Sequence, residues 1–218
     1  MAKRLADGIE FLLGDEEALR CFRFMNKVMA AQRVRSEIVL RRSRDQDIDV
    51  NAAIAAVAGE GAGAHSWRMF QLAFVLMQLP ALCDPAHKYR SGADLARVEL
   101  LFFPTGGGKT EAYLGLAAFA FAIRRRQGVV DSADGPLDGR FGLTVLMRYT
   151  LRLLTAQQFQ RASTMVCAAE LERLADPETW GDEPFRIGLW VGTKVSPNGS
   201  RRPPSSSRPR STATTTTA

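Results

Sequence analysis

Cysteine and histidine are scarce in this chain, which limits the kinds of site it can build. Among 218 residues there are three cysteines and two histidines. The cysteines lack the close spacing that zinc ligands need, and neither histidine completes a ligand set. We therefore expect free thiols in a reducing compartment and no metal site built from these residues, which are Cys21, Cys83, Cys167, His65 and His87.

Long apolar runs are missing as well. The apolar stretch at residues 71–80 is much shorter than the roughly 20 residues that a membrane-spanning helix needs. The first residues of the chain are followed by too short an apolar run for a signal peptide. Both observations predict a soluble, cytoplasmic protein with no membrane partner.

Positive charge is concentrated in the tail of the chain. The formal net charge is +6, and four of these charges come from arginines beyond residue 199, so the rest carries only +2. Charge alone therefore gives weak support for nucleic-acid binding. The tail has no apolar residue larger than alanine or proline, which predicts disorder. It is either a basic arm for nucleic acid or an out-of-frame translation product. We favour the second, because the break falls where the fold should begin its next element.

The most informative segment that is present reads Phe-Pro-Thr-Gly-Gly-Gly-Lys-Thr, at residues 103–110. It follows an apolar run and precedes an apolar helical pattern, which is the strand–loop–helix context of a phosphate-binding P-loop. Glycines let successive backbone N–H groups surround a phosphate, and the helix N-terminus adds partial positive charge. Lys109 is predicted to reach the β- and γ-phosphates of ATP, and the Thr110 hydroxyl to bind Mg²⁺. The predicted ATP-binding residues of this segment are Thr105, Gly106, Gly107, Gly108, Lys109 and Thr110.

This segment departs from the general P-loop pattern at one position. Phe103 stands where the pattern G-x-x-x-x-G-K-[ST] has its first glycine. The Pro-Thr-Gly-x-Gly-Lys-Thr version resembles that of superfamily 2 helicases and translocases. The alternative is a glycine-rich turn in an α/β protein that binds nothing.

The order of periodic segments predicts an α/β fold. Its class is an incomplete RecA-like P-loop NTPase domain, a parallel sheet with crossover helices, preceded by a helical N-terminal extension. We expect a charged break at residues 41–47 and a helix end at Pro80. Helices are expected at 16–35, 48–57, 67–79, 109–126 and 150–174, and strands at 98–103, 143–147 and 185–191. The predicted divisions are the extension at 1–64, the partial ATP-binding domain at 65–198 and the tail at 199–218.

Two further segments resemble superfamily 2 motifs. Trp67–Gln71 looks like the aromatic-x-Gln element upstream of the P-loop, and the resemblance implies that Gln71 reads the adenine edge of ATP. The other interpretation is a polar residue on a core helix. Residues 145–161 resemble motif Ia, whose helix start faces single-stranded nucleic acid. Its arginines could instead lie on a solvated helix face. The residues that this second resemblance implies are Arg148, Thr150, Arg152 and Gln157.

Taken together, these segments resemble the helicase subunit of the DISARM anti-phage defence systems, the DrmA-like family. The resemblance covers most of residues 16–198. It implies an ATP-dependent helicase or translocase with two RecA-like domains, ATP and Mg²⁺ as cofactors, and DNA and other defence-system subunits as partners.

Hydrolysis of ATP needs an acidic Asp-Glu-x-x motif on a later strand, and no such sequence follows Gly192. We therefore predict no catalytic residue in this chain. We expect a truncated, ATP-binding front part of a helicase that hydrolyses ATP negligibly alone. The alternative is a non-catalytic nucleic-acid-binding or interaction fragment.

Overall fold

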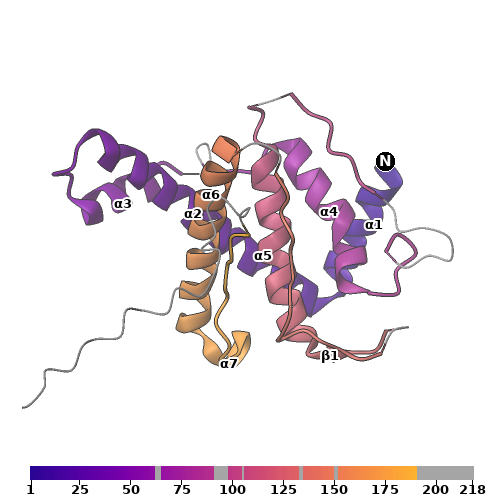
Figure 1. Cartoon of the computed structure of the whole chain (residues 1–218). Coiled ribbons are helices and arrows are strands. Elements are labelled where there is room, and N and C mark those ends of the chain that lie inside the picture. Colours follow the sequence, from indigo (N-terminus) through magenta and orange to yellow (C-terminus); the bar gives the residue numbers. More distant parts are fainter. Residues whose placement is uncertain (62–64, 91–97, 105, 133–134, 150–151, 191–218) are drawn as a thin grey trace, which may run out of the picture. The chain divides into compact units, whose positions relative to one another are not determined.

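The structure is a computed structural model that describes residues 1–61, 65–90, 98–104, 106–132, 135–149 and 152–190, without the side chains of 152–155. Helices dominate these residues, and α5 lies between α4 and α6 (Figure 1). The helices are α1 (Ala2–Gly14), α2 (Glu16–Arg44), α3 (Val50–Ala58), α4 (Met69–Cys83), α5 (Lys109–Gln127), α6 (Arg152–Ala175) and α7 (Pro177–Trp180). Two short strands, β1 (Val129–Val130) and β2 (Leu137–Asp138), form an antiparallel pair.

One hydrophobic core joins the first helices to the later ones. The long helix α2 packs against α5 and α6, and α4 packs against α1 and α5. The largest fully buried side chains come from several of these helices and include Phe24, Met25, Leu79, Leu114, Phe119 and Met165. Residues 1–187 form one compact unit, because this apolar surface is shared among helices that are distant in sequence.

Helix α2 is longer than the sequence predicts. The Asp15 side chain caps its start by accepting a hydrogen bond from the Ala18 backbone N–H at 2.9 Å. The helix continues to Arg44, so the charged break expected at residues 41–47 was placed too early. Basic side chains in a last turn are favoured by the helix dipole, and Arg41 also pairs with Glu37 and Glu60.

Helix α4 continues past Pro80, where the sequence predicts an end. A proline inside a helix lacks the N–H that would bond the carbonyl four residues earlier, here that of Leu76. Helix α1 approaches this carbonyl at Gly8, where an added Cβ would lie 2.1 Å from the Leu76 oxygen. Only a glycine allows this approach. Helix α1 therefore packs over the turn of α4 in which Pro80 leaves the Leu76 carbonyl without its helical hydrogen bond.

The predicted parallel sheet does not occur among the described residues. The segments expected as strands at 98–103 and 143–147, and the described part of 185–191, form neither strands nor helices. Burial nevertheless alternates over residues 145–148 of the second segment: Val145 and Met147 pack against the core, while Leu146 and Arg148 are exposed. The local pattern is therefore that of a strand, but a ladder also needs a neighbouring backbone.

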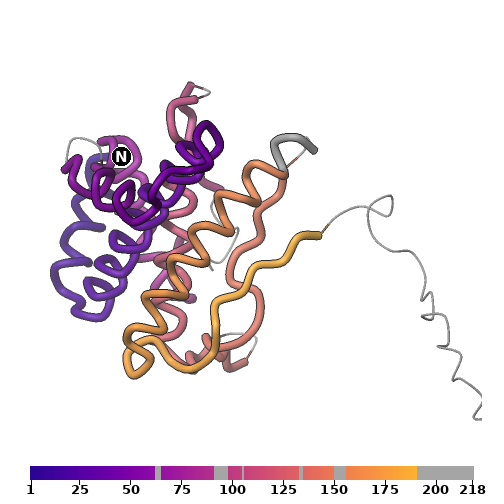
Figure 2. Tube along the Cα trace, turned by 90° about the vertical axis from the view of Figure 1, so that its left-hand side faces the viewer, coloured from indigo at the N-terminus to yellow at the C-terminus, as the bar shows by residue number. Residues whose placement is uncertain are grey.

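The chain reverses direction after α6. Asp176 caps the short helix α7 by accepting a hydrogen bond from the Thr179 N–H at 3.2 Å. The following residues run back along α6 (Figure 2), where the Phe185 N–H donates to Glu170 Oε2 at 2.9 Å. Within the described ranges, no helix is both long and apolar enough to cross a membrane.

Candidate nucleotide site at the start of α5

A tight backbone turn leads into α5. We call the described residues 104 and 106–108 the glycine turn. Gly106 and Gly108 have φ values of 80° and 88°, a region that favours glycine, and the Gly107 N–H donates to the Pro104 carbonyl at 3.1 Å. Helix α5 begins at the next residue, Lys109, so the glycine turn meets the helix N-terminus directly. Thr105, one of the predicted ATP-binding residues, lies outside the described residues.

The two residues predicted to hold phosphate and Mg²⁺ form the first positions of α5. Lys109 and Thr110 are both half-buried. The Lys109 ammonium donates a hydrogen bond to the Phe103 carbonyl, so it lies beside the residue that precedes the glycine turn. The predicted residues of this segment that the structure describes are therefore gathered at one helix start.

The N-terminus of α4 holds the glycine turn by its carbonyl groups. Arg68 Nη1 donates to the Gly107 carbonyl and Gln71 Nε2 to the Gly108 carbonyl, each at 2.7 Å. The other end of the Gln71 amide, Oε1, accepts from the Arg68 backbone N–H at 2.9 Å, which closes the start of α4. Gln71 is only 5% exposed. Both ends of its amide are thus engaged within the protein.

An aromatic pair joins the same two segments. The rings of Phe70 and Phe103 stack with centroids 3.8 Å apart and planes 12° apart. An added Cβ on Gly107 would lie 2.5 Å from the Phe103 ring. Phe103, which departs from the general P-loop pattern, therefore packs against the glycine turn and requires a glycine at position 107.

Trp67 fixes the start of α4 to the core. Its indole N–H donates to Asn26 Oδ1 of α2 at 2.6 Å. The ring also fills the space over Gly115 of α5, where an added Cβ would lie 2.7 Å from it. The glycine turn is therefore held by α4, and α4 is held by α2 and α5.

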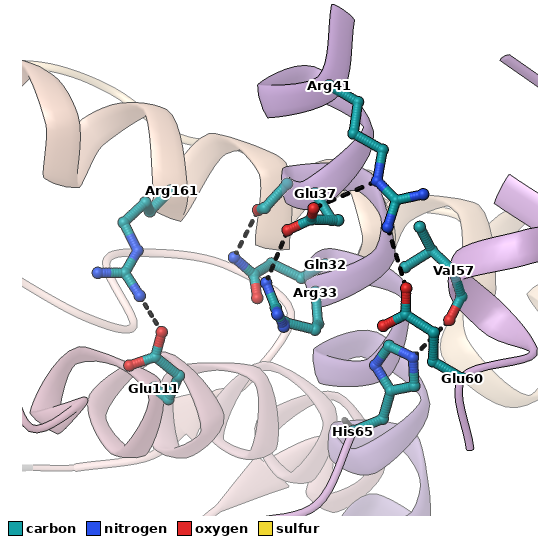
Figure 3. Close-up of polar contacts among 10 residues, drawn as sticks. Gln32, Arg33, Glu37, Arg41, Val57, Glu60, His65, Glu111 and Arg161 are labelled. Atoms are coloured by element: carbon teal, nitrogen blue, oxygen red, sulfur yellow. Dashed lines mark hydrogen bonds and ion pairs between the residues drawn. The ribbon is translucent and has the colours of Figure 1, made fainter. Parts of the chain in front are cut away.

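A charged contact connects the first turn of α5 to α6. Glu111 pairs with Arg161, as Figure 3 shows. The second carboxylate oxygen of Glu111, Oε2, is buried and has no hydrogen-bond partner among the described residues. A Cβ on Gly108 would lie 3.4 Å from this oxygen. Glu111 thus brings a negative charge next to the glycine turn, and Arg161 offsets it.

The residues predicted to contact nucleic acid are only partly described. Arg148 is exposed at the end of the segment that precedes α6, and Gln157 is exposed on α6. Thr150 and the side chain of Arg152 lie outside the described residues. Nothing in the described part of the chain brings Arg148 and Gln157 into contact with the glycine turn. Their predicted role stays a prediction.

Sequence reasoning missed several contacts of this site. Arg68, Phe70, Glu111 and Arg161 were not singled out, although each touches the glycine turn or its neighbours. Arg68 lies inside the Trp67–Gln71 element, close in sequence to the predicted site residue Gln71. That position was the one sequence signal for its role at the site. Nothing in the sequence indicates the pairing of Glu111 with Arg161, which are 50 residues apart.

The fold and this turn define a helical protein with a glycine turn and Lys-Thr at the start of a central helix. No protein-family model matches the chain. The chain is 41% identical over 197 residues, 89% of its length, to DISARM protein DrmA of Bacillus paralicheniformis. Most of its residues are therefore similar to a part of this DISARM protein. The match covers 16% of that relative, so the chain spans about a sixth of its length.

Proposed function

We propose that the glycine turn and the start of α5 bind the phosphates of ATP together with Mg²⁺, as the nucleotide-binding part of a DrmA-like helicase of a DISARM defence system. One observation carries the proposal: a turn with two glycines at positive φ leads directly into Lys109 and Thr110 at a helix N-terminus. Backbone N–H groups and the helix dipole favour an anion in this arrangement.

The residues at this helix start suit a magnesium nucleotide. The Lys109 ammonium, which donates to the Phe103 carbonyl, would exchange that oxygen for a phosphate oxygen with full negative charge. The Thr110 hydroxyl would bind Mg²⁺, and the metal would neutralise part of the phosphate charge. Side chains at Gly107 and Gly108 would collide with Phe103 and with Gln71, so the glycines let these two residues pack against the turn.

The proposal is limited to binding. Activation of a water molecule needs an acidic pair on a later strand, which the sequence after Gly192 lacks. We expect this chain by itself to bind ATP and to release phosphate no faster than its Lys109→Ala variant. Single-stranded DNA should not raise that rate.

DNA is the proposed second ligand, by analogy with superfamily 2 motif Ia. Arg148 and Gln157 are exposed near the start of α6, where Arg148 can meet backbone phosphates. Thr150 and Arg152 complete the proposed set. Other DISARM subunits are the proposed protein partners, because the relative is itself a DISARM protein.

The test is ATP binding by the whole chain, measured by isothermal titration with Mg²⁺ present. Lys109→Ala should weaken binding strongly, whereas Lys27→Ala should leave it unchanged, since Lys27 is 70% exposed on α2. Equal affinity of the wild type and Lys109→Ala would reject the glycine turn as the site. DNA binding that falls steeply with salt, but ignores both ATP and Lys109→Ala, would instead favour a non-catalytic nucleic-acid-binding role.

A further inference from the structure

We infer that Arg68 and Gln71 are positioning residues that aim the phosphate-binding N–H groups of the glycine turn, and that Gln71 acts on the turn and not on the nucleotide base. The inference rests on the proposed function, because it concerns how the same turn would hold phosphate. Arg68 is exposed at the start of α4, and this position alone would not indicate a role at the site.

The argument begins with the geometry of the peptide unit. In a trans peptide the carbonyl and the following N–H lie in one plane and point in opposite directions. The unit that contains the Gly107 carbonyl also contains the Gly108 N–H, and the next unit contains the Gly108 carbonyl and the Lys109 N–H. A side chain that fixes either carbonyl therefore fixes the direction of the N–H on its far side.

Arg68 and Gln71 fix these two carbonyls. The donor–acceptor distances are both 2.7 Å, which is short for nitrogen donors. The Gly108 and Lys109 N–H groups consequently point away from α4. Glycine has the widest backbone freedom of any residue, so without these bonds the two peptide units could rotate.

The surroundings of Gln71 argue against a base-reading role. Its amide is 5% exposed, its Oε1 accepts from the Arg68 N–H, and its Nε2 donates to the Gly108 carbonyl. To read an adenine edge, the buried amide would have to turn its second N–H and its second lone pair toward the base while keeping both present bonds, or else release the glycine turn. A buried amide that already bonds at both ends supports the turn in its present position.

The side chains also fit one another. A Cβ on Gly108 would lie 2.8 Å from Gln71 Nε2 and 4.0 Å from Arg68 Nη1. A side chain at position 108 would therefore displace the Gln71 donor, whereas Arg68 would stay at an ordinary contact distance. The stacked pair of Phe70 and Phe103 holds the other flank of the turn, so the donors of α4 stay in place.

The test compares ligands with and without a base. Binding of Mg-ATP, Mg-GTP and magnesium tripolyphosphate is measured for the whole chain and for Arg68→Ala and Gln71→Ala. We expect both variants to bind all three ligands more weakly, each by about the same factor, on the order of tenfold. Arg68→Lys should restore part of the affinity, because it keeps a charged donor. Arg33→Ala, an exposed arginine on α2, is the matched control.

Three outcomes overturn the inference. Loss of ATP affinity with unchanged tripolyphosphate affinity would assign Gln71 to the base. Unchanged affinity for all ligands would leave Arg68 and Gln71 as helix caps alone. If the wild type binds none of the ligands, the proposed function fails and the inference fails with it. Should Gln71→Ala unfold, Gln71→Glu keeps its size and places an acceptor against the Gly108 carbonyl, and it should show the same base-independent loss.

Discussion

The two ends of α5 use positive charge in different ways. At the N-terminal end, Lys109 is the only basic residue of the first turn, and its ammonium touches one backbone carbonyl beside the glycine turn. At the C-terminal end, Arg124, Arg125 and Arg126 form an uninterrupted basic run. From sequence alone the run is the more conspicuous cluster, and it has the composition of a nucleic-acid patch.

The arginines of the C-terminal run bond to other parts of the protein. Arg124 donates to the Phe141 carbonyl and to the Thr144 hydroxyl, both at 2.8 Å. Arg125 donates to the carbonyl of Trp180 at the end of α7, at 3.1 Å, and to two carbonyls that follow α7, and it lies 4.3 Å from the Phe185 ring. The C-terminal end therefore ties α5 to distant segments, whereas the N-terminal end is the proposed ligand site.

The third arginine of the run closes this network on α2. Arg126 forms two bonds with Glu17, at 2.5 and 3.0 Å, and donates to the Thr179 carbonyl. The hydrogen bond from Arg126 holds the pKa of the Glu17 carboxyl below its ordinary value. A paired charge at a helix C-terminus is favoured twice, by its partner and by the helix dipole.

The sharpest way to break this comparison is to remove the charge at the N-terminal end. Lys109→Ala should lower ATP affinity by about a hundredfold, because a charged hydrogen bond to phosphate is lost. It should leave the free energy of unfolding within about 0.5 kcal/mol, since this half-buried side chain is not part of the hydrophobic core. Titration calorimetry and urea unfolding of the same samples measure both quantities. A large loss of stability would show that Lys109 is a structural residue like the arginines.

The matching change at the other end should have the opposite profile. Arg125→Ala leaves several carbonyl groups without their donor and should lower the free energy of unfolding by about 2 kcal/mol. ATP affinity of the folded protein should not change, because Arg125 is at the far end of α5. Urea unfolding with Arg33→Ala as control tests this. An unchanged unfolding midpoint would contradict the structural role of the run.

These contrasts show what the sequence could and could not predict. Helices α3, α5 and α6 were expected within a few residues of their bounds, because their apolar periodicity is local. The glycine turn at the start of α5 was expected because its sequence motif is also local. The passage of α4 through Pro80 could not be read locally, since it depends on the approach of Gly8 from α1.

The strand predictions failed for a related reason. Residues 145–148 have a strand-like alternation, with Val145 facing the core and Leu146 exposed. Such a pattern specifies which side of a segment is buried, but not whether another backbone lies beside it. The same holds for Arg68, whose role depends on a carbonyl 39 residues away, that of Gly107.

Low pH should weaken the contacts at the C-terminal end of α5 and so lower the stability of the protein. The pKa of Glu17 is lowered in the folded state, so its pairing with Arg126 stabilises the protein above the ordinary value of 4.5. This stabilisation is lost as the pH falls through the lower, folded pKa. Because both side chains are partly exposed, we expect a loss of about 1 kcal/mol. The free energies of unfolding of the wild type and Glu17→Gln, measured with urea between pH 7 and pH 3, should converge at low pH. Parallel curves would show that Glu17 contributes no acid dependence.

The smallest expected effect is at the N-terminal end, where Arg161 of α6 meets Glu111. Each side chain is about one-third exposed, so removal of the pair by Arg161→Ala should change the free energy of unfolding by only about 0.5 kcal/mol. Arg161→Lys, which keeps the charge, should change it less. A loss above about 2 kcal/mol, or an equally large fall in ATP affinity, would show that α6 holds the start of α5 in place. The two ends of α5 would then differ only in which helix they are fastened to, and the glycine turn would depend on α6 as it does on α4.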